Sequence, residues 1–160
     1  MARQPVHRSE LVEIDLGEAN AVLRRLSRAV GPLRGHKFAV GIRRAGELTV
    51  AGAAVCAMPA AGPLQDGLTV ELHRIAVATV APANAMERLL AGIADLAARH
   101  GYRRLVAHGA AGAGAKALEA AGWCVLPQRL ATTIDGRPDA DDRNGWRPRL
   151  WTRVLRGELR

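Results

Sequence analysis

Residues 68–101, LTVELHRIAVATVAPANAMERLLAGIADLAARHG, decide the fold of this chain. The first ten of them carry branched and apolar side chains in the alternation that is typical of a β-strand. Residues 85–99 place apolar side chains at the spacing of one helix face, and Gly101 is positioned to end that helix. Asn84 followed by Glu87 has the form of a capping box at the helix start. The centre of the chain is therefore predicted to be a long strand joined to a long amphipathic helix.

The same two periodicities predict shorter elements on both sides of this segment. Glycine and proline separate these elements, and no internal repeat or linker divides the chain. The order of elements indicates one α+β domain with a mixed, mostly antiparallel sheet flanked by helices. The elements predicted outside the central segment are a strand at 11–15, a helix at 17–30, strands at 36–43, 48–58 and 103–108, a helix at 115–121, and strands at 123–130 and 150–155.

The composition limits the class of protein. The chain has 160 residues, of which 49% are hydrophobic, enough for one domain with a continuous core. Its net charge of +8 comes almost wholly from arginine, in two basic flanks around a neutral middle. Such flanks attract nucleic acid, but they are not interleaved with aromatic residues, so support for a nucleic-acid partner is weak.

Membrane and metal chemistry find no support in the sequence. No stretch approaches the roughly 20 apolar residues of a membrane helix, and the first ten residues lack the apolar block of a signal peptide. We therefore expect a cytoplasmic protein with no membrane partner. Cys56 and Cys124 stand apart from any ligand-like histidine, which favours two small packed thiols over a metal site.

Three segments resemble the GNAT superfamily of N-acetyltransferases. Residues 71–77, ELHRIAV, are similar to the family's fourth strand, and the amphipathic helix follows it as in the family. Residues 117–123, ALEAAGW, resemble the family's helix that ends in a glycine-aromatic pair. The likeness covers about 11–155 of a single domain, 1–160. Residues 35–38, GHKF, resemble more narrowly an uncharacterised GNAT-like group of bacteria and phages, from which no activity transfers.

The resemblance implies a GNAT-like acyl-CoA N-acyltransferase fold with acetyl-CoA as the acyl donor. The unpaired amides of a first helical turn suit a diphosphate, and a splayed strand end suits the pantetheine arm. The family's leading basic residue and Gly-x-Gly are absent here, and Glu87 adds a negative charge, so an ordinary capped helix is the alternative. The expected cofactor-binding residues are Ile75, Ala76, Val77, Ala83, Asn84, Ala85, Met86, Glu87 and Arg88.

Acyl transfer to an amine needs a base for the amine and a proton for the departing sulfur. The resemblance and the strand alternation favour Glu71 as the base, on one face with His73, Ile75 and Val77. Partial burial is expected to raise the pKa of Glu71. His73 is the second candidate, as base or water relay. A polar pair on a wet strand face is the alternative for both residues.

The general acid departs from the family pattern. Leu118 stands where many members have a tyrosine, and the single tyrosine, Tyr102, is expected to pack. His108, at the end of its strand, is a candidate acid, and His36 is a candidate for lining the acceptor side. The family's acceptor pocket corresponds to residues 27–37 and 135–145, where acidic side chains either attract a cationic amine or serve as turn residues. These acids are Asp139, Asp141 and Asp142, near two tryptophans expected to pack, Trp146 and Trp151.

Two functions compete at this point. The first is an N-acetyltransferase that moves an acetyl group from acetyl-CoA to a primary amine on a small molecule or a macromolecule. The second is a non-catalytic GNAT-like binding module, associated with nucleic acid through its arginine flanks. The sequence is compatible with a monomer or a homodimer, and it identifies neither the amine nor the acyl chain length.

Overall fold

The computed structural model describes residues 8–26, 31–109, 113–126 and 149–155, and the predicted order of strands and helices is confirmed. The elements are β1 (Ser9–Ile14), α1 (Leu16–Leu26), β2 (Phe38–Arg44), β3 (Gly52–Ala57), the short 3₁₀ helix η1 (Gly62–Leu64), β4 (Thr69–Val77), α2 (Ala85–Arg99), β5 (Arg104–His108), α3 (Ala113–Ala120), β6 (Cys124–Val125) and β7 (Leu150–Val154). The predicted loop at 136–145, with its three aspartates, and Trp146 lie outside the described residues.

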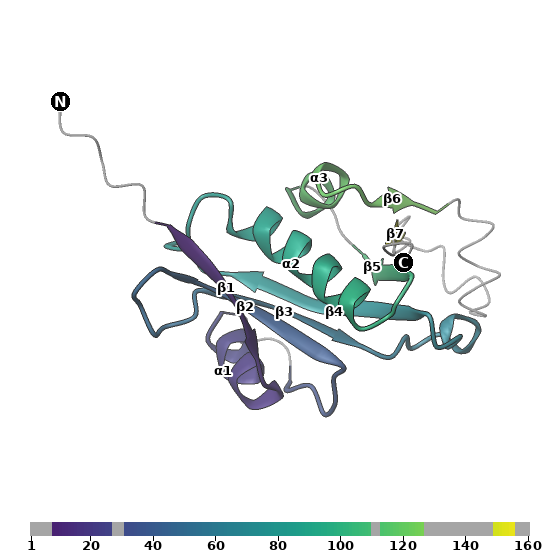
Figure 1. Ribbon diagram of the computed structural model, residues 1–160, viewed down its shortest axis with the longest axis horizontal. Coiled ribbons are helices and arrows are strands. Elements are labelled where there is room, and N and C mark those ends of the chain that lie inside the picture. Colours follow the sequence, from purple (N-terminus) through teal and green to yellow (C-terminus); the bar gives the residue numbers. More distant parts are fainter. Residues whose placement is uncertain (1–7, 27–30, 110–112, 127–148, 156–160) are drawn as a thin grey trace, which may run out of the picture.

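Seven strands form one sheet in the order β1-β2-β3-β4-β5-β7-β6. Neighbouring strands are antiparallel except β4 and β5, which run parallel. Helix α1 lies on one face of the sheet, and α2 and α3 lie on the other (Figure 1). The predicted α+β class, with a mixed and mostly antiparallel sheet between helices, is confirmed.

Each face of the sheet has its own apolar core. Helix α1 buries Val22 and Leu23 against β2 and β3, as the helical spacing of its sequence predicts. Helix α2 buries Leu89 and Ile93 in a larger cluster on the opposite face. Trp151 of β7 is fully buried in that cluster, so its predicted packing role is confirmed. The two cores hold the sheet from both sides and fix the position of β4 at its centre.

Strands β4 and β5 pair only at their beginnings. The parallel register runs from Thr69 opposite Arg104 to Glu71 opposite Val106 and then stops. Beyond this point β4 continues to Val77 beside β3, while β5 pairs with β7 on its other side. The sheet therefore opens between β4 and β5, and within the described residues no strand pairs with this edge of β4 beyond Glu71.

A β-bulge interrupts the pairing of β4 with β3. Val55 lies opposite Arg74, but the next residue, Cys56, lies opposite Leu72, so His73 is an extra residue in β4. An extra residue in one strand breaks the strict alternation of side chains between the two faces. Residues before and after position 73 must therefore be assigned to faces separately.

The bulge corrects one prediction about the faces of β4. Glu71 and His73 do share a face, and their side chains are 3.6 Å apart. Ile75 and Val77 were expected beside them but pack in the opposite cluster, with α2. The alternation that held from Glu71 to His73 is reset by the bulge, which a sequence pattern of period two does not reveal.

Two element boundaries also differ from the prediction. β3 begins at Gly52 instead of 48, and Leu48 is 89% exposed in the preceding loop. A Cβ at position 52 would lie 2.9 Å from the Ala76 carbonyl oxygen, so glycine lets β3 approach β4 closely. At α2 the expected capping box is absent, because the Asn84 side chain makes no capping hydrogen bond. The backbone of Asn84, with φ −106° and ψ 23°, is outside the extended region that capping side chains use.

The prediction of two packed thiols is half correct. Cys56 is fully buried in β3, where burial and the nearby Glu71 carboxylate raise the pKa of its thiol. Cys124 is exposed, because it lies in the two-residue strand β6 at the edge of the sheet.

Candidate functional site

A cavity of about 440 Å³ lies where β4 and β5 separate. Residues from β4, β5 and all three helices line it, so it is built by the opening of the sheet and not by a surface loop. Its lining residues are Leu23, Leu72, His73, Arg74, Ile75, Ala76, Met86, Leu90, Ala107, His108, Gly109, Gly114 and Leu118.

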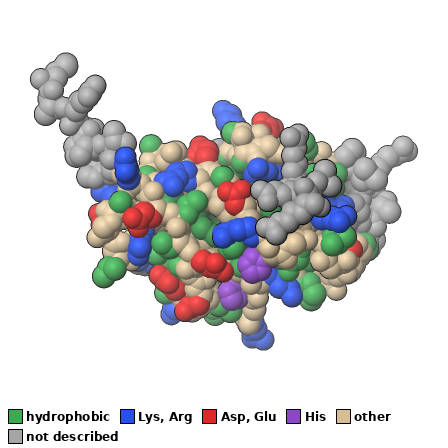
Figure 2. Space-filling view, in the orientation of Figure 1, with side chains coloured by type: hydrophobic (Ala, Val, Ile, Leu, Met, Phe, Trp, Pro, Cys, Tyr) green, Lys and Arg blue, Asp and Glu red, His purple; other side chains and the backbone are tan. Residues whose placement is uncertain are grey.

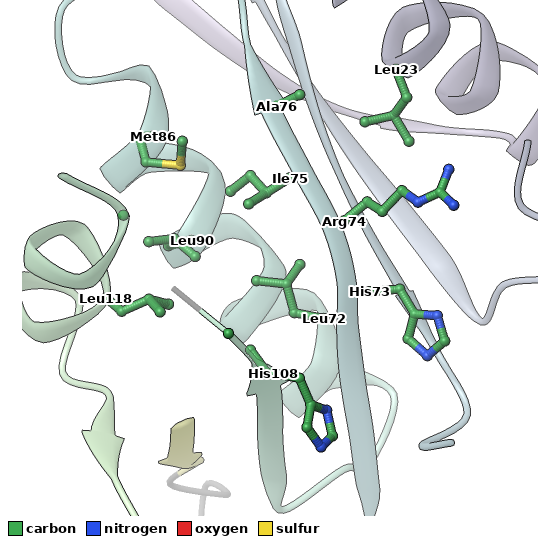
Figure 3. Close-up of a pocket in the computed structure, with 13 residues that line it drawn as sticks. Leu23, Leu72, His73, Arg74, Ile75, Ala76, Met86, Leu90, His108 and Leu118 are labelled. Atoms are coloured by element: carbon green, nitrogen blue, oxygen red, sulfur yellow. The ribbon is translucent and has the colours of Figure 1, made fainter. Parts of the chain in front are cut away.

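The cavity has two chemically different sides (Figure 3). On the side of α2 and α3, Ile75 points toward Met86, Leu90 and Leu118, which form an apolar wall. On the side of α1, His73 and Arg74 project from β4 and add polar and basic groups beside Leu23 and Ala76. The cavity therefore joins an apolar channel on one face of the sheet to a basic pocket on the other.

The open edge of β4 offers unpaired backbone groups to the cavity. The N–H of Ala78 donates to the Ala51 carbonyl at 2.8 Å, toward β3. Hydrogen bonds to one neighbour recur at every second residue of an antiparallel strand, so Ala76 also turns its backbone toward β3. Ile75 and Val77 consequently direct their N–H and C=O groups toward the opening. An extended ligand can pair with these groups as an added strand.

The first turn of α2 begins beside the apolar side of the cavity, which Met86 lines. The Arg88 amide donates to the Asn84 carbonyl at 3.0 Å, and the Ala85 amide donates at 2.9 Å to a carbonyl three residues earlier. These two predicted cofactor contacts therefore have backbone partners already. The amides of Asn84, Met86 and Glu87 have no acceptor within the helix, as expected of a first turn.

The side chain of Arg88 also lies away from the helix start. Its guanidinium donates to the Ser9 carbonyl at 2.6 Å and to the Ser9 hydroxyl, which ties α2 to β1. Arg88 thus has a structural partner on the edge strand and is occupied there.

Glu71 is buried, with 8% of its side chain exposed, and it connects three segments of the chain. Its Oε1 accepts a hydrogen bond from His108 Nδ1 at 2.9 Å, and its Oε2 accepts one from the Ala60 amide at 2.9 Å. His73 Nε2 lies 3.6 Å from Oε2, within ion-pair range but too long for a hydrogen bond. Glu71 does not line the cavity, whereas His73 and His108 both do.

The ionisation of Glu71 differs from the prediction. Burial raises the pKa of a carboxyl group, but the hydrogen bonds from His108 and the Ala60 amide, with the nearby His73 imidazole, stabilise the carboxylate. Together they outweigh burial and hold the pKa of Glu71 well below its usual range. The Glu71 carboxylate in turn raises the pKa of His73, against the opposing effect of burial. Glu71 is therefore an ionised anchor, and the imidazoles face the cavity.

The other candidates for proton transfer are placed as follows. Leu118 of α3, which the resemblance placed at a tyrosine position, lines the cavity. Tyr102 packs against Phe38, with 6.0 Å between ring centroids, so its packing role is confirmed. His36 is not among the lining residues, whereas His108 is. Sequence reasoning named His108 but gave no sign of its contact with Glu71, which lies 37 residues earlier in the chain.

Within the described ranges, no group of three or more His, Cys, Asp or Glu side chains is arranged to hold a metal ion. None of the helices in the described part of the chain is long and apolar enough to span a membrane.

Solved structures of GNAT proteins have the same fold as this chain. No protein-family model and no curated protein matches the sequence. Solved structures do match. A GNAT-family protein from Desulfovibrio desulfuricans superposes with a TM-score of 0.67 at 16% identity, covering 93% of this chain and 100% of its own. The Salmonella typhimurium protein yncA, solved with its cofactor acetyl-CoA, gives 0.61 at 16% identity over 95% and 96%.

An enzyme with a defined substrate also matches. The ribosomal-protein-S18-alanine N-acetyltransferase from Escherichia coli gives a TM-score of 0.60 at 14% identity, covering 96% of this chain and 99% of its own. At such low identity these likenesses concern architecture and leave the substrate undetermined. The fold of this chain is that of the GNAT acetyltransferases.

Proposed function

We propose that this protein is an N-acetyltransferase that transfers an acetyl group from acetyl-CoA to a primary amine. One observation carries the proposal: the cavity passes between β4 and β5 and joins an apolar channel to two imidazoles. A thioester arm entering along the channel and an amine entering from the other face would meet at this opening.

The residues present fit the cofactor in three respects. Ile75 and Val77 offer the strand edge to the amide groups of the pantetheine arm, and the apolar wall suits its methylene chain. The amides of Asn84, Met86 and Glu87 offer donors to the diphosphate. Ala83, which is exposed, leaves room beside them in place of the family's glycine. When bound, acetyl-CoA supplies the activated acetyl group.

The imidazoles of His73 and His108 would move the proton in this proposal. An ionised carboxylate only accepts hydrogen bonds, so the proton between Glu71 and His108 resides on Nδ1. In a neutral ring this makes Nε2 the basic nitrogen, directed by Glu71. An imidazole takes the proton that the amine loses as its nitrogen bonds to the acetyl carbon, and the same proton is available to the departing sulfur. Glu71, first predicted as the base, becomes the positioning residue.

Measurement of thiol release tests this proposal. The protein is incubated with acetyl-CoA and a panel of primary amines, and free CoA thiol is followed over time. We expect amine-dependent release, with kcat lowered at least tenfold in His108→Gln or His73→Gln, while acetyl-CoA binding by calorimetry is retained. Glu71→Gln, which removes the positioning carboxylate, should also lower kcat. Its matched control is Glu10→Gln, which changes an exposed carboxylate on β1. Absence of acetyl-CoA binding, or full turnover in the double histidine variant, would contradict the proposal.

The alternative of a nucleic-acid-binding module gains no specific support. Figure 2 shows basic and acidic side chains intermixed over one face of the molecule. The described residues on that face therefore form no continuous basic surface of the kind that binds a phosphate backbone.

A further inference from the structure

We propose that the acceptor is an amino acid, with a carboxylate one or two carbons from its amine, and that Arg74 binds this carboxylate. The inference rests on the proposed function and assigns the substrate class of the same cavity. It is carried by the bulge in β4, by the environment of the Arg74 guanidinium, and by the charges that line the cavity.

The bulge places an imidazole and a guanidinium on the same side of β4. In a regular strand, His73 and Arg74 would project to opposite faces of the sheet. Because His73 is the extra residue, Arg74 instead shares the α1 face with it, and Figure 3 shows both side chains on that side of β4. The two charges are close enough for Arg74 to oppose protonation of His73. An amine held at His73 would therefore have a cation beside it.

One edge of the Arg74 guanidinium is available to a ligand. Its Nη1 donates to the Gly31 carbonyl, which fixes the plane of the group. The opposite edge, formed by Nε and Nη2, is the one that matches the two oxygens of a carboxylate. Within the described residues, no carboxylate lies within ion-pair distance of Arg74. A cation that lines a concave site without a carboxylate partner is suited to an anionic group of a substrate.

The charges around the cavity favour the same class of ligand. None of the described residues that line it is an aspartate or a glutamate. The nearby Glu71 carboxylate is already bonded to His108 and to the Ala60 amide, with His73 beside it. A diamine would bring a second positive charge to Arg74 and be repelled, whereas an amine with an anionic group would be attracted.

The spacing of the two groups narrows the class further. Neighbouring residues of a chain have Cα atoms about 3.8 Å apart. Because His73 and Arg74 are neighbours in the chain and share one face, an acceptor that reaches both groups would carry its amine and its carboxylate on a short backbone, as in an α- or β-amino acid. Leu23 and Ala76 complete this side of the cavity with apolar surface, which suits an apolar side chain on the acceptor.

Matched pairs of amines test the inference. L-leucine and β-alanine are compared with leucinamide and β-alaninamide, in which the carboxylate is replaced by a neutral amide. Phosphoethanolamine is added as an amine that carries a different anion. We expect kcat/KM for each amino acid to exceed that for its amide at least tenfold, since a charge-assisted pair is lost in the amide. Arg74→Gln is expected to reduce that ratio at least tenfold, and Arg74→Lys to restore part of it. Arg43→Gln, which removes an arginine paired with Glu10 outside the cavity, should leave the ratio unchanged.

A binding measurement separates this inference from the proposed function. The same pairs are titrated into the protein with CoA present, and binding is followed by saturation-transfer NMR. An amino acid that binds no better than its amide overturns the role of Arg74, whether or not acetyl transfer occurs. If Arg74→Gln weakens binding of the acids and of the amides equally and also lowers the melting temperature, the role of Arg74 is structural, through its hydrogen bond to the Gly31 carbonyl. A preference for phosphoethanolamine over both amino acids would overturn the carboxylate assignment. Carboxylate-selective binding without thiol release would contradict the proposed function alone.

Discussion

Glu71 shows how three contacts determine the behaviour of one carboxylate. The residue type and its place on the strand were predictable, and so was the neighbouring His73 on the same face. The direction of its pKa shift was not predictable, because the Ala60 amide and His108 come from segments 11 and 37 residues away. Burial alone would have raised the pKa, and only the folded chain supplies the donors that reverse the effect.

The pKa shifts of Glu71 and His73 predict how stability depends on pH. The lowered pKa of Glu71 stabilises the fold above its unfolded value of about 4.3, and this contribution is lost as the pH falls through the folded pKa. The raised pKa of His73 stabilises the fold below its unfolded value of about 6.5, and this contribution is lost as the pH rises through the folded pKa.

The difference in unfolding free energy between the wild type and Glu71→Gln should therefore be largest between about pH 5 and 6.5. We expect a difference of about 1–3 kcal/mol there, decreasing on both sides, measured by urea denaturation across the pH range. Glu10→Gln, exposed and paired with Arg43, should differ from the wild type by less than about 0.5 kcal/mol. A Glu71→Gln difference that is constant with pH would contradict the assigned shifts.

At the scale of elements, the first turn of α2 has amides without helical acceptors and also one negative side chain, Glu87. Glu87 stabilises the helix start through the helix dipole, but it also opposes a diphosphate bound at the same turn. Glu87→Gln should therefore lower the unfolding free energy by about 0.3–1 kcal/mol. It should also tighten acetyl-CoA binding about two- to fivefold, because a like charge near the phosphates is removed.

Asp95→Asn is the matched control for this pair of opposite effects. Asp95 is exposed on the same helix, about 12 Å further along its axis and beyond the screening length of roughly 8 Å at physiological salt. Calorimetry with acetyl-CoA should show unchanged affinity for this variant. Weaker binding in Glu87→Gln would exclude the first turn of α2 from the diphosphate site.

The pairing of β3 with β4 depends on one glycine. An alanine at Gly52 would bring its Cβ to 2.9 Å from the Ala76 carbonyl, a backbone atom that cannot move alone. Gly52→Ala should lower the unfolding free energy by about 1–3 kcal/mol and weaken acetyl-CoA binding, because the shifted β4 carries the edge at Ile75 and Val77. Gly62→Ala, where a Cβ meets nothing within 4 Å, should change neither quantity. Equal stability of both variants in urea would show that β3 adapts without cost.

The order of elements was predictable because each strand and helix carries its own periodicity. Residues 85–99, for example, form α2 with the bounds that the sequence indicates. The bulge was not predictable, because it is a property of two paired strands, and ELHRIAV looks continuous when β4 is considered alone. For the same reason the sequence did not show that His73 and Ile75 serve opposite sides of the cavity.

For the whole molecule, binding of the cofactor should appear as thermal stabilisation. A ligand at one hundred times its Kd stabilises a protein by about 2.7 kcal/mol. For a domain of this size that corresponds to a rise in Tm of about 5–10 °C. Acetyl-CoA and CoA should both produce it in a thermal scan, and adenosine alone should produce much less, since it lacks the diphosphate and the pantetheine arm. No rise at millimolar acetyl-CoA would contradict binding at this cavity.

The bulge also means that chain length, as much as residue type, sets the chemistry of β4. Deleting residue 73, rather than replacing it, would restore unbroken alternation along the strand. Both ends of the strand would keep their present faces, because Leu72 and Arg74 would then follow one another opposite Cys56 and Val55. The extra residue therefore adds one side chain to the α1 face and leaves the apolar edge beyond it in place, so its deletion would remove the imidazole alone. A substitution at position 73 would keep the bulge and change only the group that it presents.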